Sequence, residues 1–162
     1  MISSFSFVSC IKNENLKPNP RHKSPYSGTY DNIPEDEGLI GKFGNTIFKM
    51  ENCSYSINEG LALSTITAYS DDGNQHITFT INEAIKRKKV YQVVNGNLSM
   101  IYDADALNFS SKEDIYIAYT GTLTITTIGD KKVSGTFSFA GSNFQKSKST
   151  SIKNGLFSAK KN

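Results

Sequence analysis

The strongest constraint on the fold is an alternation of apolar and polar residues with a period of two. In residues 122–126, Leu123 and Ile125 alternate with threonines, and in residues 133–139 small and apolar residues alternate with Ser and Thr. This spacing places apolar side chains on one face of a β-strand and polar side chains on the other. Because no long segment shows a 3.6-residue period, the sequence predicts an all-β fold.

Turn signals between these segments predict which strands are neighbours. Three hairpins are expected: 121–140 across Gly129-Asp130-Lys131, 64–81 across Asp71-Asp72-Gly73-Asn74, and 90–102 across Asn95-Gly96. Further strands are expected at 45–50, 114–120 and 152–159. Only residues 82–89, with Asn82 as a cap, have the character of a helical turn. About eight or nine short strands with little helix predict an antiparallel β-sandwich, or a flattened barrel.

The distribution of proline predicts where this domain begins. All 4 prolines lie between Pro18 and Pro34, among Asn, Ser, Gly and charged residues. Proline cannot donate a hydrogen bond to a β-ladder, so it suits an extended linker and not a sheet. The sequence therefore predicts a short segment 1–10, a linker 11–38 and a β domain 39–162, with the boundary near Gly38.

Segment 1–10 ends like a bacterial lipoprotein signal. In Phe7-Val8-Ser9-Cys10 a bulky apolar residue stands three positions before the cysteine, and a small residue directly precedes it. This pattern predicts that Cys10 is linked to diacylglycerol and anchors the protein in the cell envelope, on the outer membrane. A basic n-region is missing before Phe5, which a start codon placed too far downstream would explain. The alternative is an ordinary terminus or a short first strand with a buried thiol.

Size and charge exclude several classes of protein. The chain of 162 residues is long enough for one globular domain with a core. Its formal net charge of +3 is too small for a dedicated nucleic-acid binder, which must neutralise many phosphates. No apolar run approaches the roughly 20 residues that a membrane-spanning helix needs.

Four segments carry a resemblance to a known family. They are Gly41-Lys42-Phe43-Gly44-Asn45-Thr46-Ile47-Phe48, Tyr91-Gln92-Val93, residues 121–126 with 132–139, and Ile152-Lys153-Asn154-Gly155-Leu156-Phe157. On these segments, residues 39–162 resemble the small β-sandwich lipoproteins of unknown function that are typical of Bacteroidota. The resemblance implies secretion and lipid anchoring, and it carries over no catalytic residue.

Residues that could perform chemistry are few and scattered. His22 and His76 are isolated, so neither a metal cluster nor a catalytic triad is indicated, and we expect neither a cofactor nor enzymatic activity. Cys53 has no neighbour that would activate its thiol, and we interpret it as a small buried residue. Asp103 and Asp105 form a weak candidate site for a cation, with a solvated loop as the default.

Two groups of residues are candidates for binding. Amphipathic tyrosine rings can stack on sugars or contact a protein, and the candidates are Tyr69, Tyr102, Tyr116 and Tyr119. The basic run consists of Lys86, Arg87, Lys88 and Lys89, and its default interpretation is a solvated loop. We therefore expect a non-catalytic envelope module that binds a protein or a glycan. The alternative is an immunity or inhibitor protein that captures a toxin or enzyme, and a hydrolase is a weaker third hypothesis.

Overall fold

The computed structural model describes residues 37–44, 46–105, 114–143, 145 and 147–162. These residues form one sheet of ten strands and a single short 3-10 turn. The elements are β1 (Gly38–Phe43), β2 (Thr46–Met50), β3 (Asn52–Asn58), β4 (Leu63–Tyr69), β5 (His76–Ile81), β6 (Lys89–Gln92), η1 (Val93–Asn95), β7 (Leu98–Asp103), β8 (Ile115–Ile128), β9 (Lys132–Asn143) and β10 (Lys148–Lys161).

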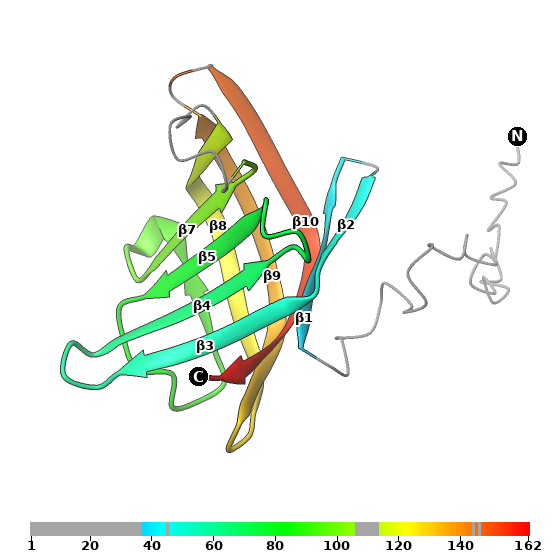
Figure 1. Cartoon of the computed structure of the whole chain (residues 1–162). Coiled ribbons are helices and arrows are strands. Elements are labelled where there is room, and N and C mark those ends of the chain that lie inside the picture. Colours follow the sequence, from blue (N-terminus) through cyan, green and yellow to red (C-terminus); the bar gives the residue numbers. More distant parts are fainter. Residues whose placement is uncertain (1–36, 45, 106–113, 144, 146) are drawn as a thin grey trace, which may run out of the picture.

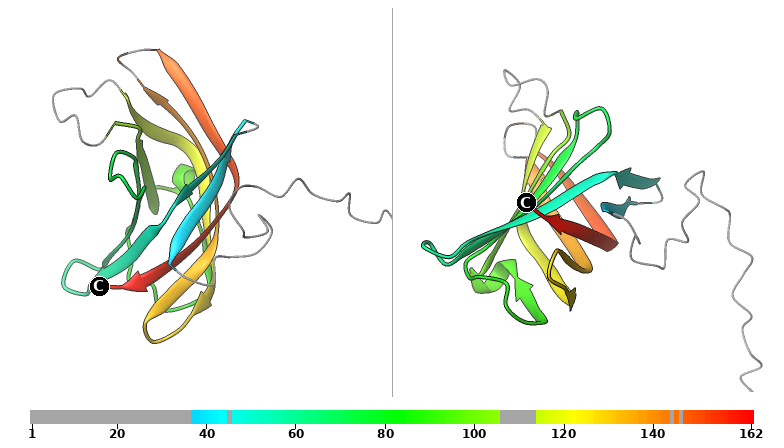
Figure 2. Two further views of the ribbon diagram at one scale, coloured as in Figure 1. Left: turned by 45° about the vertical axis from the view of Figure 1, so that its right-hand side comes forward. Right: turned by 60° about the horizontal axis from the view of Figure 1, so that its bottom comes forward.

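Seven of the strands close into a barrel. Figures 1 and 2 show how the sheet curves round to form it. The closed path runs β10-β3-β4-β5-β7-β8-β9 and returns to β10. All neighbours on this path are antiparallel except β3 and β10, which pair in parallel at Lys160↔Ser54 and Lys161↔Tyr55. Closure provides hydrogen-bond partners for the backbone N–H and C=O groups of the barrel strands, which would be unpaired at an open edge.

The remaining strands extend the sheet by pairing with those parts of the long barrel strands that no other barrel strand covers. β1 pairs with β10 from Gly38↔Ser158 to Phe43↔Ile152, and β2 pairs with β1. β8 is shared in the same way, because β7 pairs with residues 115–117 and β6 with residues 122–125. Figure 1 shows β1 and β2 leaving the barrel as a projecting hairpin.

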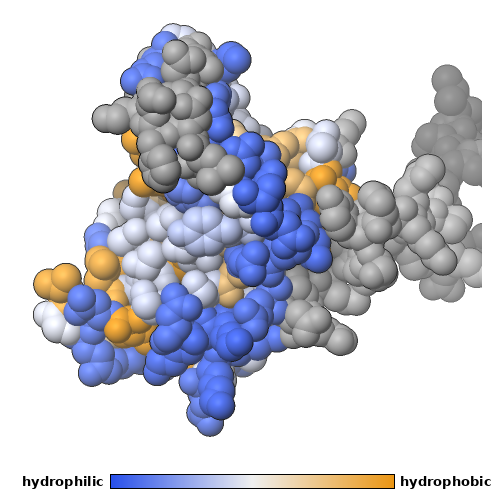
Figure 3. All heavy atoms as spheres, in the orientation of Figure 1, coloured by the Kyte–Doolittle hydropathy of each residue, from blue (hydrophilic) through white to orange (hydrophobic). Residues whose placement is uncertain are grey.

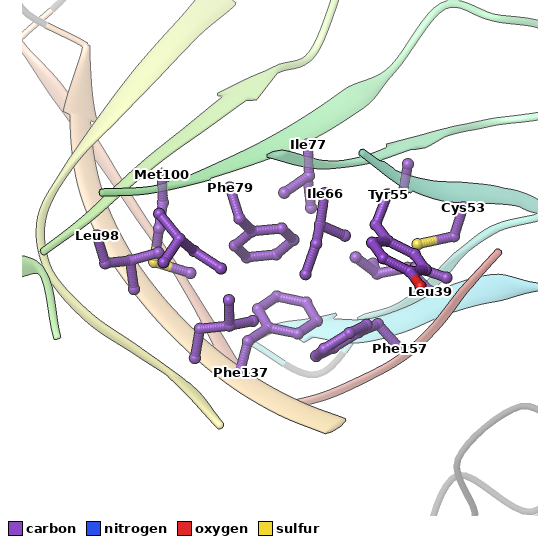
Figure 4. Close-up of a cluster of buried hydrophobic side chains, with 14 of the residues drawn as sticks. Leu39, Cys53, Tyr55, Ile66, Ile77, Phe79, Leu98, Met100, Phe137 and Phe157 are labelled. Atoms are coloured by element: carbon purple, nitrogen blue, oxygen red, sulfur yellow. The ribbon is translucent and has the colours of Figure 1, made fainter. Parts of the chain in front are cut away.

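The core lies inside the barrel and consists of the inward residues of each alternating strand. Phe79 of β5 meets Phe137 of β9 edge-to-face, with 5.1 Å between ring centroids, and Phe157 of β10 lies beside them (Figure 4). Such aromatic pairs add to the stabilisation that burial alone provides. The rings therefore link opposite walls of the barrel.

The loop between β5 and β6 closes one end of the barrel. Ile85 is buried in the core, and its backbone N–H donates to Ser64 Oγ over 2.9 Å. Ser64 Oγ in turn donates to the backbone oxygen of Glu83. This segment contains no helical turn, so the expected turn over 82–89 is wrong, and Asn82 instead donates to the backbone oxygen of Gly96. Burial of Ile85 selects the irregular conformation.

The all-β prediction is confirmed, in its barrel form, and two of the three hairpins are confirmed. β4 pairs with β5, and β8 pairs with β9. The hairpin over 90–102 is wrong: Gly96 does adopt the left-handed conformation, with φ 69°, but β6 pairs with β8 and β7 lies between β5 and β8. Three strands, at 14, 12 and 14 residues for β8, β9 and β10, are longer than the expected short strands.

Candidate functional site

A groove of about 680 Å³ crosses the outer face of four neighbouring strands, β1, β10, β9 and β8. Its lining is formed by Lys42, Thr122, Thr136, Phe137, Ser138, Asn154, Gly155 and Leu156. Three spacings between strands of about 4.8 Å give the groove a span of about 14 Å. The volume lies within the range of sites that hold small organic ligands.

Asn154 reaches this groove because β10 contains a bulge. The register between β10 and β9 shifts between Ile152 and Gly155, so that Lys153 and Asn154 lie opposite the single residue Ser138. Asn154 has a φ of 54°, a left-handed conformation that Asn tolerates better than most residues. Bulges of this kind redirect a side chain out of the regular alternation.

Gly155 allows the floor of the groove to be tightly packed. A Cβ atom at this position would lie 2.2 Å from the nearest ring atom of Phe137, which is cross-strand to Gly155. The Phe137 ring is buried in the core below, and the side chains on either side of Gly155 line the groove. The groove is therefore supported by core packing and not by a flexible loop.

Hydroxyl groups form the centre of the groove. The hydroxyl oxygens of Thr122 and Ser138 lie 2.9 Å apart, and these residues are cross-strand partners. When one hydroxyl donates to the other, the acceptor keeps its own proton for a ligand. The Thr136 hydroxyl and the Asn154 amide make no hydrogen bond to any described residue. Both groups can therefore donate to and accept from a bound molecule.

Lys42 supplies the positive charge of the groove. Its ammonium forms no ion pair with the part of the chain that the structure describes, and no Asp or Glu lines the groove. Hydroxyl, amide and ammonium groups at a half-buried surface recognise polar ligands by hydrogen bonding.

The four candidate tyrosines do not form one surface. Tyr69 and Tyr119 are 45% and 58% exposed, but Tyr102 is 7% exposed, so its assignment to a binding surface is wrong. Tyr102 points into the barrel because it alternates with Ile101 on β7, and it stacks on Tyr116 with 5.9 Å between ring centroids. None of the four lines the groove.

The basic run lies at the barrel end closed by Ile85, away from the end where β4 meets β5 at Tyr69. Lys86, Arg87 and Lys88 are exposed, whereas Lys89 forms an ion pair of 2.7 Å with Glu83. Hydrogen bonding from Lys89 lowers the pKa of the Glu83 carboxyl below its ordinary value. Lys89 thus helps to hold the loop that closes the barrel. The three exposed residues of the run are consistent with a solvated loop.

The remaining candidates offer little chemistry. Asp103 Oδ1 accepts a hydrogen bond from the backbone N–H of Asp105 over 3.1 Å, which is a local turn. Among the described residues, no group of three or more His, Cys, Asp or Glu could hold a metal ion. Cys53 is buried, and desolvation raises the pKa of its thiol to about 12. Cys10 lies outside the described residues.

Sequence reasoning missed the groove because its residues are ordinary outward positions of strands. The one available signal was Asn154-Gly155, since a glycine inside a strand pattern often marks a bulge. On the face seen in Figure 3, hydrophilic residues surround a paler centre, and hydrophobic residues appear as separate patches. The groove is distinguished from other outward strand positions by its hollow shape and its lysine.

Fold and site define a small closed β-barrel with a polar groove on its outer wall. The chain belongs to the family described as Domain of unknown function (DUF6252), whose model matches residues 36–159. Comparison with curated proteins and with solved structures found no match. No helix in the described ranges has the length and apolar character needed to cross a membrane.

Proposed function

We propose that this protein is a non-catalytic binding module of the cell envelope, and that the groove across β1, β10, β9 and β8 holds a polysaccharide. The observation that carries the proposal is the composition of the groove: hydroxyls of Thr122, Thr136 and Ser138, the Asn154 amide and the Lys42 ammonium, with no carboxylate. Such groups match the many hydroxyls of a sugar chain. A rigid floor supports affinity, because little ordering is needed on binding.

The proposal excludes turnover for a chemical reason. Hydrolysis of a glycosidic bond ordinarily uses two carboxyl groups on either side of the bond. The groove lining contains none. A ligand in this groove would be held and released unchanged.

A variant whose groove is filled by a larger side chain tests the proposal. Thr136→Tyr places a large side chain in the groove, and Thr80→Tyr is the matched control, because Thr80 is an outward, half-buried threonine on β5. We expect Thr136→Tyr to weaken binding of envelope polysaccharide at least tenfold in affinity electrophoresis, and Thr80→Tyr to leave it unchanged. Equal binding by both variants would contradict a site in the groove. One stoichiometric toxin or enzyme, retained without polysaccharide, would favour the inhibitor alternative.

We also propose that Cys10 anchors the protein to the outer membrane through diacylglycerol. The support is the pattern Phe7-Val8-Ser9-Cys10 followed by a polar, proline-rich segment. Two acyl chains are enough for stable attachment, since each buried methylene contributes about 0.8 kcal/mol. Expressed from an upstream start, the protein should take up labelled fatty acid and fractionate with membranes, and Cys10→Ser should abolish both. Label that persists in Cys10→Ser would disprove the anchor.

A further inference from the structure

We infer that the ligand of this groove is an acidic saccharide, with its anionic group at Lys42. The inference rests on the proposed function and adds the charge of the ligand. Its basis is the imbalance between donors and acceptors in the lining. An ammonium carries three donors and no acceptor, and no carboxylate in the groove or ion pair in the described chain occupies it.

A neutral sugar would leave the charge of Lys42 without a counter-charge. Its hydroxyls can exchange hydrogen bonds with Thr136, Ser138 and Asn154, because each of those groups both donates and accepts. Lys42 gains most from an acceptor with a negative charge, since the attraction between opposite charges then adds to the hydrogen bond. The carboxylate of a uronic acid and the sulfate of a sulfated sugar both supply that acceptor.

The apolar parts of the groove fit the same class of ligand. Leu156 and the methyl groups of Thr122 and Thr136 provide small apolar surfaces between the polar groups. Pyranose rings carry C–H faces between their hydroxyls, so they match such an alternating surface. A flat hydrophobic ligand would instead cover the Thr136 hydroxyl and the Asn154 amide without giving either of them a hydrogen-bond partner.

Tyr119 extends this surface along β8. It lies at a second bulge, where the register between β8 and β9 shifts between Ala118 and Thr120, and it is 58% exposed. It is three residues from Thr122, which corresponds to about 10 Å along a strand. A saccharide longer than the groove can therefore stack on this ring, so Tyr119→Ala should weaken long chains and leave the shortest fragments unaffected.

Matched ligands isolate the anionic group. The first probe is polygalacturonate, compared with the same polymer after its carboxyl groups are reduced to alcohols; the second is dextran sulfate, compared with dextran. Each is titrated into the full chain by isothermal calorimetry. We expect an acidic polymer to bind at least tenfold more tightly than its neutral counterpart, and the pair that shows this difference identifies carboxylate or sulfate.

Two variants locate the effect. Lys42→Gln should remove the preference for the acidic polymer while leaving the weak binding of the neutral one, and Lys88→Gln is the matched control because Lys88 is exposed in the basic loop. Equal affinity for acidic and neutral polymers, or equal loss in both variants, would overturn the inference. It would leave the proposed function standing if Thr136→Tyr still weakens binding of envelope polysaccharide at least tenfold. No binding by any polymer, with envelope polysaccharide retained through the groove, would also overturn it. If envelope polysaccharide does not bind in the groove at all, the proposed function itself is overturned.

Discussion

At the residue scale, Cys53 shows how burial controls reactivity. Its side chain is 2% exposed, and desolvation, with the charge of Glu37 adding to it, raises the thiol pKa to about 12. The thiolate is the reactive form, so the folded protein should not react with disulfide reagents at pH 8. In the Cys10→Ser variant, where Cys53 is the remaining cysteine of two, we expect Ellman's reagent to detect a thiol only after denaturation. Rapid labelling of the folded variant would contradict the buried position.

Phe137 is the residue on which core and groove both depend. It contacts Phe79 across the barrel and lies under Gly155. Phe137→Ala should lower the free energy of unfolding by about 3–5 kcal/mol, because it leaves a cavity between opposite walls. Urea denaturation measures this change, and Thr80→Ala on the outer face serves as the control. A loss below about 1 kcal/mol would show that the ring is not part of the core.

Three buried groups predict the behaviour of the protein at alkaline pH. Desolvation raises the pKa of Tyr102 to about 12, and burial with the hydrogen bond to Glu83 does the same for Tyr91; Cys53 is raised to about 12 as well. Their folded pKa values exceed the unfolded ones of 9.0 and 10.0, so their contribution is complete below about pH 9 and is lost as the pH rises toward 12. Denaturation midpoints should fall over that interval, and a constant midpoint would contradict these shifts.

At the scale of elements, the buried Ser64 hydroxyl bonds to two backbone groups of the loop between β5 and β6. Ser64 Oγ accepts from the Ile85 N–H and donates to the Glu83 backbone oxygen. Ser64→Ala should leave both backbone groups without this partner, at a cost of about 1–3 kcal/mol. Amide hydrogen exchange should then increase at residues 82–88 and remain unchanged in β9. Ser99→Ala, at an exposed position of β7, is the control that should leave residues 82–88 protected.

Local patterns predicted the elements better than they predicted the pairing between them. The hairpins β4–β5 and β8–β9 were predictable because alternation and a short turn determine both strands and register. β3 was not predicted, since its inward positions begin with the small Cys53 and its apolar signal is weak. The parallel contact between β3 and β10 joins strands about 100 residues apart in the chain, and no local signal encodes it.

At the scale of the whole molecule, closure of the barrel decides which predicted residues share a surface. It buries Tyr102 and separates Tyr69 from the basic loop, while the pairing of β1 and β9 with β10 brings Lys42, Thr136 and Asn154 together from three strands. Sequence reasoning identified none of these three as site residues, because each is an unremarkable polar position until β1, β9 and β10 are placed side by side. The bulge at Asn154 then directs its amide into the groove.

The measurement that tests the central claim most directly is a nuclear magnetic resonance titration of the isotope-labelled full chain with envelope polysaccharide. The claim is that the outer groove, and neither Tyr69 nor the basic run, is the primary ligand-binding surface. We predict that the amide shifts change first at Lys42, Thr122, Thr136, Ser138 and Asn154. Changes confined to residues 86–88, or to Tyr69 and its neighbours, with the groove amides unmoved, would contradict the account.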